Sequence, residues 1–145
     1  GVSNTILDKP GKLNDEEFDA LKQHTFHTHQ IIGRIESLSK LGDLAACHHE
    51  KLNGRGYHRG IESSELPISA RLLAVADIFE ALTAARPYRD GMPLEKVHAI
   101  LGGDAGTAIC AESYEALCTW LDRQAFTHRV DAQLEAIDGL LEELG

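Results

Sequence analysis

Residues 68–85, ISARLLAVADIFEALTAA, are apolar almost all the way around a helix. A helix of this kind is buried on most of its sides, so the stretch predicts a central helix of the domain. Pro67 fits its first turn. Asp77 interrupts the apolar sequence midway along. A carboxylate there is costly unless it is paired with an arginine, such as Arg71 or Arg86, or bound to a metal ion.

Helical spacing of apolar residues recurs from one end of the chain to the other, and no stretch alternates long enough to predict a strand. Asn14 and Glu17 have the spacing of a capping box and predict the start of a long helix, bent near Gly33. Further helices are expected from about Lys40 or Asp43 to Lys51, and at about 93–101, 111–125 and 130–144. The chain should therefore be an all-α bundle of about five to six helices.

Length and composition bound the class of protein. The 145 residues, 43% hydrophobic and 26% charged, suit one domain over 1–145. A net charge of −9 argues against a polymeric nucleic acid as partner. No apolar run approaches the roughly 20 residues of a membrane span and the first residues do not resemble a signal peptide, so we expect no membrane partner and a cytoplasmic location. The three cysteines lack CxxC spacing and are expected to be buried, reduced thiols.

Two adjacent histidines, His48 and His49, precede a glycine-rich stretch at 53–66. Neighbouring residues of a helix do not share one face, so the pair suits two nearby metal ions better than a packed core. The glycines would let the loop approach a ligand closely. Glu50 could orient an imidazole, or it could be a solvated acid at a helix end.

A third histidine, His24, projects from the inward side of the first long helix. Together with His48, His49 and Asp77 it would bring nitrogen and carboxylate ligands from three helices to one interior, as helical bundles do when they bind metals. The four residues predict a metal centre. His29, by contrast, does not share the spacing of His24 and is expected on the surface.

Arg86 and Arg89 follow Asp77 just beyond the end of the predicted central helix. The planar guanidinium group matches phosphate oxygens, so the pair could form an anion clamp beside the metal. The alternative is a capping cluster for that helix.

These segments resemble a known family. Residues 48–60, HHEKLNGRGYHRG, and 65–92, ELPISARLLAVADIFEALTAARPYRDGM, are similar to the second half of the HD-GYP family of bacterial metal-dependent phosphohydrolases. The opening residues 1–26 resemble the segment that follows the His-Asp dipeptide in that family. The resemblance covers about residues 1–105 and leaves 106–145 as C-terminal helices.

The resemblance implies an HD-domain bundle with a bi- or trinuclear iron or manganese centre that hydrolyses the signalling molecule cyclic di-GMP to pGpG or GMP. Its implied metal ligands are His24, His48, His49 and Asp77. Tyr57 would lie in the loop on the substrate side, and Arg86 and Arg89 would face the phosphates. Metal ions and arginines would then share the charge of the phosphodiester.

Two departures qualify what the resemblance implies. No His-Asp dipeptide occurs in the chain, so it should precede Gly1, and His58 stands where the family signature has proline. We therefore expect the C-terminal part of a phosphodiesterase, weakly active or inactive in isolation, with no certain catalytic residue of its own. The alternatives are a degenerate regulatory or binding module and a phosphohydrolase of another nucleotide. Apolar surface left uncovered should favour self-association.

Overall fold

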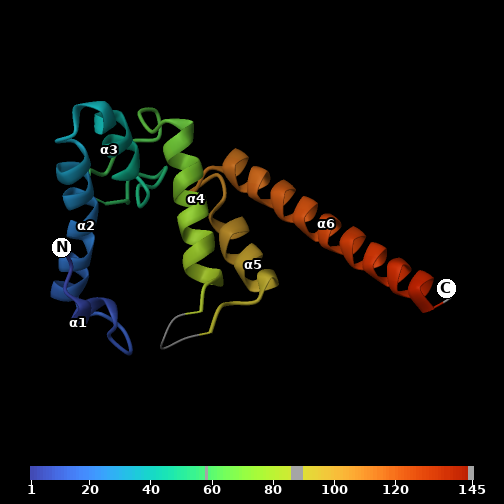
Figure 1. The fold of residues 1–145 in the computed structure, drawn as a ribbon. Coiled ribbons are helices and arrows are strands. Elements are labelled where there is room, and N and C mark those ends of the chain that lie inside the picture. Colours follow the sequence, from blue (N-terminus) through green and yellow to red (C-terminus); the bar gives the residue numbers. More distant parts are fainter. Residues whose placement is uncertain (58, 86–89, 144–145) are drawn as a thin grey trace. The chain divides into compact units, whose positions relative to one another are not determined.

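The computed structural model describes residues 1–57, 59–85 and 90–143, and this part of the chain is all-α, as predicted (Figure 1). No named strand occurs within it; one isolated bridge joins Ala105 to Ile109. No helix in the described ranges is long and apolar enough to cross a membrane. The elements are α1 (Asn4–Leu7), α2 (Asp15–Ile32), a 3-10 helix (Glu36–Leu38), α3 (Ser39–Ala45), α4 (Ile68–Thr83), α5 (Leu94–Asp104) and α6 (Ala111–Glu143).

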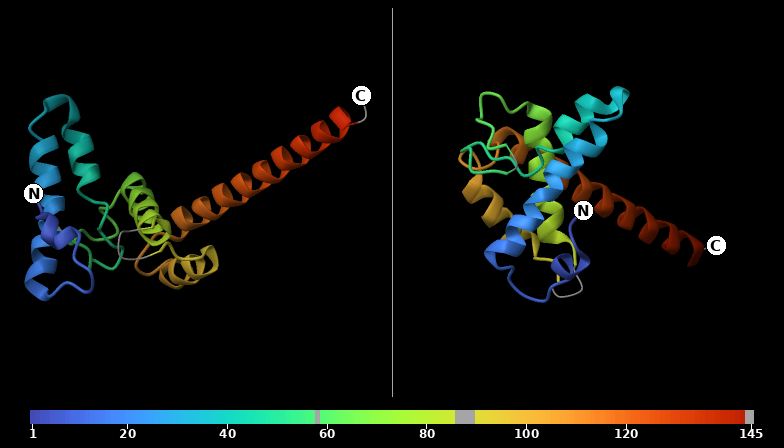
Figure 2. Two further views of the ribbon diagram at one scale, coloured as in Figure 1. Left: turned by 60° about the horizontal axis from the view of Figure 1, so that its bottom comes forward. Right: turned by 90° about the vertical axis from the view of Figure 1, so that its left-hand side faces the viewer.

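The capping box at the start of α2 is confirmed. The backbone N–H of Glu17 donates to Oδ1 of Asn14 at 2.8 Å, and the backbone N–H of Asn14 donates to the Glu17 carboxylate at 2.8 Å. The predicted bend at Gly33 is the end of the helix. From there the chain turns back, and α3 packs beside α2 (Figure 2). A Cβ on Gly42 would lie 3.0 Å from the backbone nitrogen of Gly33, so a larger residue there would push the two segments apart by a few tenths of an ångström.

Three predicted helix boundaries were wrong. Helix α3 ends at Ala45, so His48 and His49 lie in the turn that follows it. Helix α5 continues through Gly102 and Gly103 to Asp104. Helix α6 is continuous where two helices were predicted, because no glycine or proline interrupts residues 111–138.

The chain divides into two compact units, Gly1–Tyr114 and Glu115–Gly145. The first unit contains α1 to α5 and the start of α6. The described part of the second unit is the remainder of α6, on which Trp120 and Phe126 are exposed. A single domain over 1–145 stays a prediction.

Helix α4 contacts α3 and α5 within the first unit. It buries Ala70, Ala74 and Val75. Its predicted burial on nearly all sides was wrong, since Ile68 is 55% and Leu72 49% exposed. The helix therefore leaves an apolar strip on its surface.

The loop between α3 and α4 has a small core of its own. Cys47, Leu66 and Ala70 are buried together, and Leu44, Leu52 and Ile61 pack against them. Burial raises the pKa of the Cys47 thiol, which keeps it protonated and unreactive. Cys47 and Cys110 are buried and unbridged, as predicted, and Cys118 is half-buried and unbridged.

Glu50 fastens the glycine loop from within. The side chain is 3% exposed, and its carboxylate accepts backbone N–H groups of Arg59, Gly60 and Ile61 at 2.7, 3.2 and 3.1 Å. A buried carboxylate needs such donors. Glu50 is thus not a solvated acid at a helix end, and it holds the returning arm of the loop against the turn that carries His48 and His49.

The loop approaches this turn too closely for a side chain at Gly56. A Cβ there would lie 2.5 Å from Cα of Glu50 and 2.7 Å from the carbonyl oxygen of His49. The next backbone N–H, of Tyr57, donates to that same His49 oxygen at 3.3 Å. Glycine at 56 therefore sets the position of the following tyrosine.

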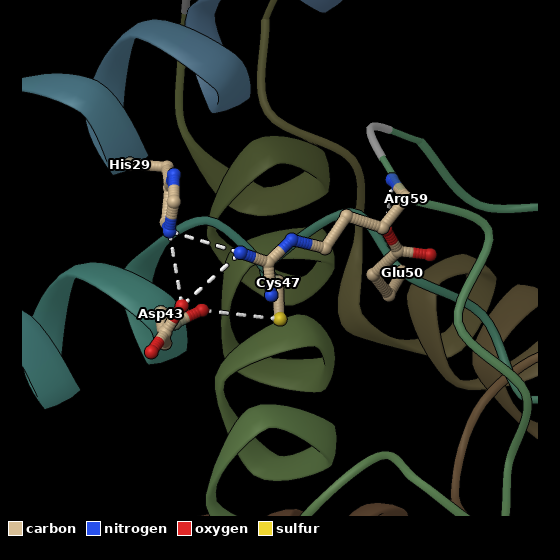
Figure 3. Close-up of polar contacts among 5 residues, drawn as sticks. All are labelled: His29, Asp43, Cys47, Glu50 and Arg59. Atoms are coloured by element: carbon tan, nitrogen blue, oxygen red, sulfur yellow. Dashed lines mark hydrogen bonds and ion pairs between the residues drawn. The ribbon is translucent and has the colours of Figure 1, made fainter. Parts of the chain in front are cut away.

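A second fastening lies on the outer side of the loop (Figure 3). The Arg59 guanidinium donates to Oδ1 of Asp43 at 3.1 Å and lies 2.9 Å from Nε2 of His29. Hydrogen bonding from Arg59 lowers the pKa of the Asp43 carboxyl. His29, expected on the surface, is instead part of this polar contact between α2, α3 and the loop.

We expect Glu50→Gln to lower the free energy of unfolding by about 1–3 kcal/mol, because the amide removes the charge and turns an N–H₂ group toward backbone donors. Urea unfolding followed by circular dichroism would measure the change. Glu62→Gln, at an exposed position of the same loop, is the matched control and should change stability by less than about 0.5 kcal/mol. Equal stabilities of Glu50→Gln and the wild type would contradict this role for Glu50.

Candidate metal centre

Three imidazoles meet where α2 and the turn after α3 lie side by side. His24 comes from α2, and His48 and His49 come from the turn. One ring nitrogen of each lies within 4.8 Å of one ring nitrogen of the other two. Residues 24 apart in the sequence are thus brought to one point by the packing of α2 on α3.

The backbone fixes which nitrogen each ring offers. Nδ1 of His24 lies 2.6 Å from the carbonyl oxygen of Leu21, and Nδ1 of His48 lies 2.6 Å from that of Ala45. A carbonyl oxygen only accepts hydrogen bonds, so both Nδ1 atoms carry the proton. Both Nε2 atoms of the neutral rings then present lone pairs.

These two lone pairs point at one another. Nε2 of His24 lies 2.9 Å from Nε2 of His48. Two lone pairs at this distance repel unless a metal ion lies between them or one ring takes up a second proton and donates it to the other. Neighbouring nitrogen ligands bound at about 2.1 Å to one metal ion are separated by roughly 3 Å. The donor set therefore fits a divalent metal ion.

His49 extends the cluster toward α4. Its ring centroid lies 4.2 Å from that of His48, and its Nδ1 lies 3.5 Å from Oδ2 of Asp77. Burial, followed by the charges of His48 and His24, lowers the pKa of His49 to about 4. The ring is therefore neutral at pH 7, as a metal ligand must be.

Asp77 is the acidic member of the group. Its side chain is 33% exposed, so the carboxylate predicted within an apolar helix faces the histidines at the edge of the core. Arg71, one of the two arginines considered as its partner, donates to the backbone carbonyls of Leu66 and Ser63 at 2.7 and 2.6 Å. That arginine ties the end of the loop to α4.

Tyr57 covers the cluster from the glycine loop. Its ring centroid lies 4.7 Å from that of His49 and 6.4 Å from that of His24. Burial, reinforced by the charge of Asp77, raises the pKa of the phenol, which therefore keeps its proton at neutral pH. A protonated phenol can donate a hydrogen bond to an anion.

Five of the eight predicted site residues thus lie together: His24, His48, His49, Asp77 and Tyr57. Glu50 lies next to them in sequence, but its carboxylate binds the loop backbone, and the predicted orientation of an imidazole stays a prediction. Arg86 and Arg89 lie outside the described residues, as does His58.

The sequence reading missed one feature beside this cluster. A pocket of about 320 Å³ is lined by Tyr57 and by four residues of α2, namely Asp19, Lys22, Gln23 and Phe26. These four residues have the i, i+3, i+4, i+7 spacing of one helix face. That spacing could have indicated from the sequence that they lie together.

Comparison with known proteins agrees with the fold. Residues 3–109 match the family described as HD domain. The 3'3'-cGAMP-specific phosphodiesterase 3 of Vibrio cholerae is 46% identical over 117 residues, which cover 81% of this chain and 25% of that protein. The cyclic di-GMP phosphodiesterase of Thermotoga maritima is 41% identical over 118 residues, 80% of this chain and 32% of that protein.

A third relative is matched over most of the chain. The cyclic di-GMP phosphodiesterase response regulator RpfG of Xanthomonas campestris is 33% identical over 140 residues, which cover 95% of this chain and 34% of that protein. The chain thus spans about a quarter to a third of the length of these relatives. On the match over 3–109 and on the histidine pair with its glycine loop, the chain belongs to the HD domain family and to the HD-GYP type within it.

Proposed function

We propose that this chain is part of a metal-dependent phosphodiesterase that hydrolyses a cyclic dinucleotide. The observation that carries the proposal is the 2.9 Å approach of two imidazole nitrogens whose protons lie on the opposite ring atoms. A metal ion bound between the two nitrogens relieves that repulsion, as a second proton on one ring would, and the relatives named above are phosphodiesterases of cyclic dinucleotides.

In this proposal the ligands are His24, His48, His49 and Asp77, and the metal is iron or manganese, both of which accept nitrogen and carboxylate ligands. The bound metal would polarise the phosphoryl oxygen and supply hydroxide. Tyr57, protonated and adjacent to the cluster, donates to the phosphodiester. Arg86 and Arg89 are proposed to offset its negative charge.

The substrate is proposed from the relatives. One is named for cyclic di-GMP and another for 3'3'-cGAMP, and both molecules contain guanine. We propose cyclic di-GMP, hydrolysed to pGpG or GMP, as the first substrate to test. The isolated 145 residues are expected to be weakly active or inactive, because three histidines and one carboxylate hold an incomplete multinuclear centre. Self-association stays a prediction.

A non-catalytic regulatory or binding module is the second candidate. One sequence fact favours it: residue 58 is histidine where the family signature has proline. Such a module would keep the fold and bind a nucleotide without cleaving it.

Hydrolysis by a longer protein that contains this chain decides between the two. Loaded with iron or manganese under anaerobic conditions, it should convert cyclic di-GMP or 3'3'-cGAMP to linear product, and His49→Ala should lower kcat/KM about 100-fold or more. Chromatographic separation of the cyclic and linear nucleotides measures the conversion by the wild type and by the variant. A protein with stoichiometric metal that leaves both substrates intact would favour the binding module.

Metal binding can be tested on the chain itself. His48→Ala should weaken the binding of Mn²⁺ or Co²⁺ at least about tenfold, because it removes one of the two converging nitrogens. Titration calorimetry, or the visible absorption of Co²⁺, measures the affinity. His27→Ala, which removes a histidine of α2 outside the cluster, is the control and should bind as the wild type does. Equal affinities for all three proteins would contradict the site.

The metal-free protein should lose stability as the pH falls from about 6.5 toward 4. In this window His49 binds a proton in the unfolded chain but not in the folded one, since its pKa is lowered from 6.5 to about 4. Above pH 6.5 His49 is neutral in both the folded and the unfolded chain, so it does not make the free energy of unfolding depend on pH. Urea unfolding in EDTA at several pH values measures the effect. The free energy of unfolding of His49→Asn should depend less steeply on pH than that of the wild type. Equal slopes for the two proteins would contradict the lowered pKa of His49.

A further inference from the structure

The pocket beside Tyr57 has the size and composition of a subsite for one nucleobase. Its volume of about 320 Å³ is at the lower end of ligand pockets, roughly 300–1,000 Å³, which suits one base and its sugar better than a whole dinucleotide. Phe26, 39% exposed, and Tyr57 supply aromatic surface on which a base can stack.

The polar residues of the pocket form one charged pair. Nζ of Lys22 lies 2.5 Å from Oδ1 of Asp19, one turn away on α2. Lys22 also lies 5.1 Å from the ring centroid of Phe18, and that ring contacts Tyr57 edge-on at 6.0 Å. An ammonium and a carboxylate joined to one another keep further donor and acceptor capacity. The pair therefore presents a donor and an acceptor side by side in the pocket.

We propose that this pocket binds guanine and that Asp19 and Lys22 select it over adenine. The Watson–Crick edge of guanine carries an acceptor, O6, next to two donors, the N–H groups at N1 and N2. Lys22 can donate to O6, and Asp19 can accept from N1 and N2. The charges of the pair therefore complement this edge.

Adenine in the orientation that guanine takes mismatches the pair at both positions. Its amino group at position 6 would face the Lys22 ammonium, donor against donor, and its N1 would face the Asp19 carboxylate, acceptor against acceptor. Turned over, adenine pairs with both groups but makes one hydrogen bond fewer than guanine, whose N1 and N2 both donate to the carboxylate. The side chains of Lys22 and Asp19 are 32% and 70% exposed, so discrimination comes from the hydrogen bonds gained with guanine and not from burying unpaired groups. Gln23, whose amide both donates and accepts, does not discriminate by itself.

The inference rests on the proposed function, since it names the part of the substrate that lies next to the metal. Tyr57 belongs to both places: it lines the pocket, and its ring lies 4.7 Å from that of His49. A base held in the pocket would leave its phosphodiester within reach of the imidazoles. Asp19 and Lys22 are then specificity determinants that take no part in the chemistry.

Binding of GMP and AMP tests the subsite independently of hydrolysis. We would titrate each nucleotide into the 145-residue chain, with Mn²⁺ and again in EDTA, and follow the base protons by saturation-transfer NMR. GMP should bind about tenfold or more tightly than AMP in both conditions. The preference in EDTA does not depend on metal, so it survives even where the phosphodiesterase proposal fails.

Asp19→Asn should strengthen AMP binding, a result that a misfolded protein could not produce. An asparagine amide can donate to N1 of adenine and accept from its amino group, so this variant should bind AMP more tightly than the wild type and bring the two affinities within about threefold. Lys22→Met should weaken GMP binding, because O6 loses its donor, and should not weaken AMP binding, because the donor–donor contact with adenine is removed. Glu16→Gln, the same change of charge at an exposed position of α2 outside the pocket, should keep the wild-type ratio.

Four results would overturn the inference. Absence of GMP binding in both conditions would remove the subsite. Equal affinities of the wild type for GMP and AMP would remove its selectivity. A GMP preference left unchanged by both Asp19→Asn and Lys22→Met would assign selectivity to other residues. Hydrolysis without guanine preference would overturn this inference and leave the proposed function intact.

Discussion

The site depends on one buried carboxylate. Glu50 accepts three successive backbone N–H groups of the glycine loop from a position next to His49. These bonds hold the returning arm of the loop, while the close packing at Gly56 holds its outgoing arm on the same turn. Tyr57 can lie over the histidines only because both arms are fixed. Loops are normally the mobile parts of a domain, and here a charge-assisted network makes the loop part of the site.

Hydrogen bonds to the backbone also orient the imidazoles. His24 and His48 each donate from Nδ1 to the carbonyl oxygen three residues earlier. Each ring is therefore oriented by its own local structure, and the packing of α2 on α3 then brings the two Nε2 atoms together. The approach of the two Nε2 atoms thus combines local hydrogen bonds with the packing of α2 on α3.

How much could be predicted from the sequence depends on how far apart along the chain the interacting residues lie. The capping box of Asn14 and Glu17 and the apolar periodicity are local, so the helices and their approximate positions were predicted. The end of α3 at Ala45 was not, because the turn that carries His48 is stabilised by the loop that packs on it. The partner of Glu50 lies 9 to 11 residues away in a stretch without periodicity. The histidine set was predictable because residue types alone restrict what they bind.

Helix α2 connects the two halves of the proposed chemistry. His24 differs by one position, about 100° around the helix, from Gln23 on the pocket face. One rigid element thus presents a metal ligand on one side and the base-selecting pair Asp19 and Lys22 on the adjacent side. Selectivity can change there without moving the ligand, because exposed side chains of a helix are replaced at little cost to its backbone.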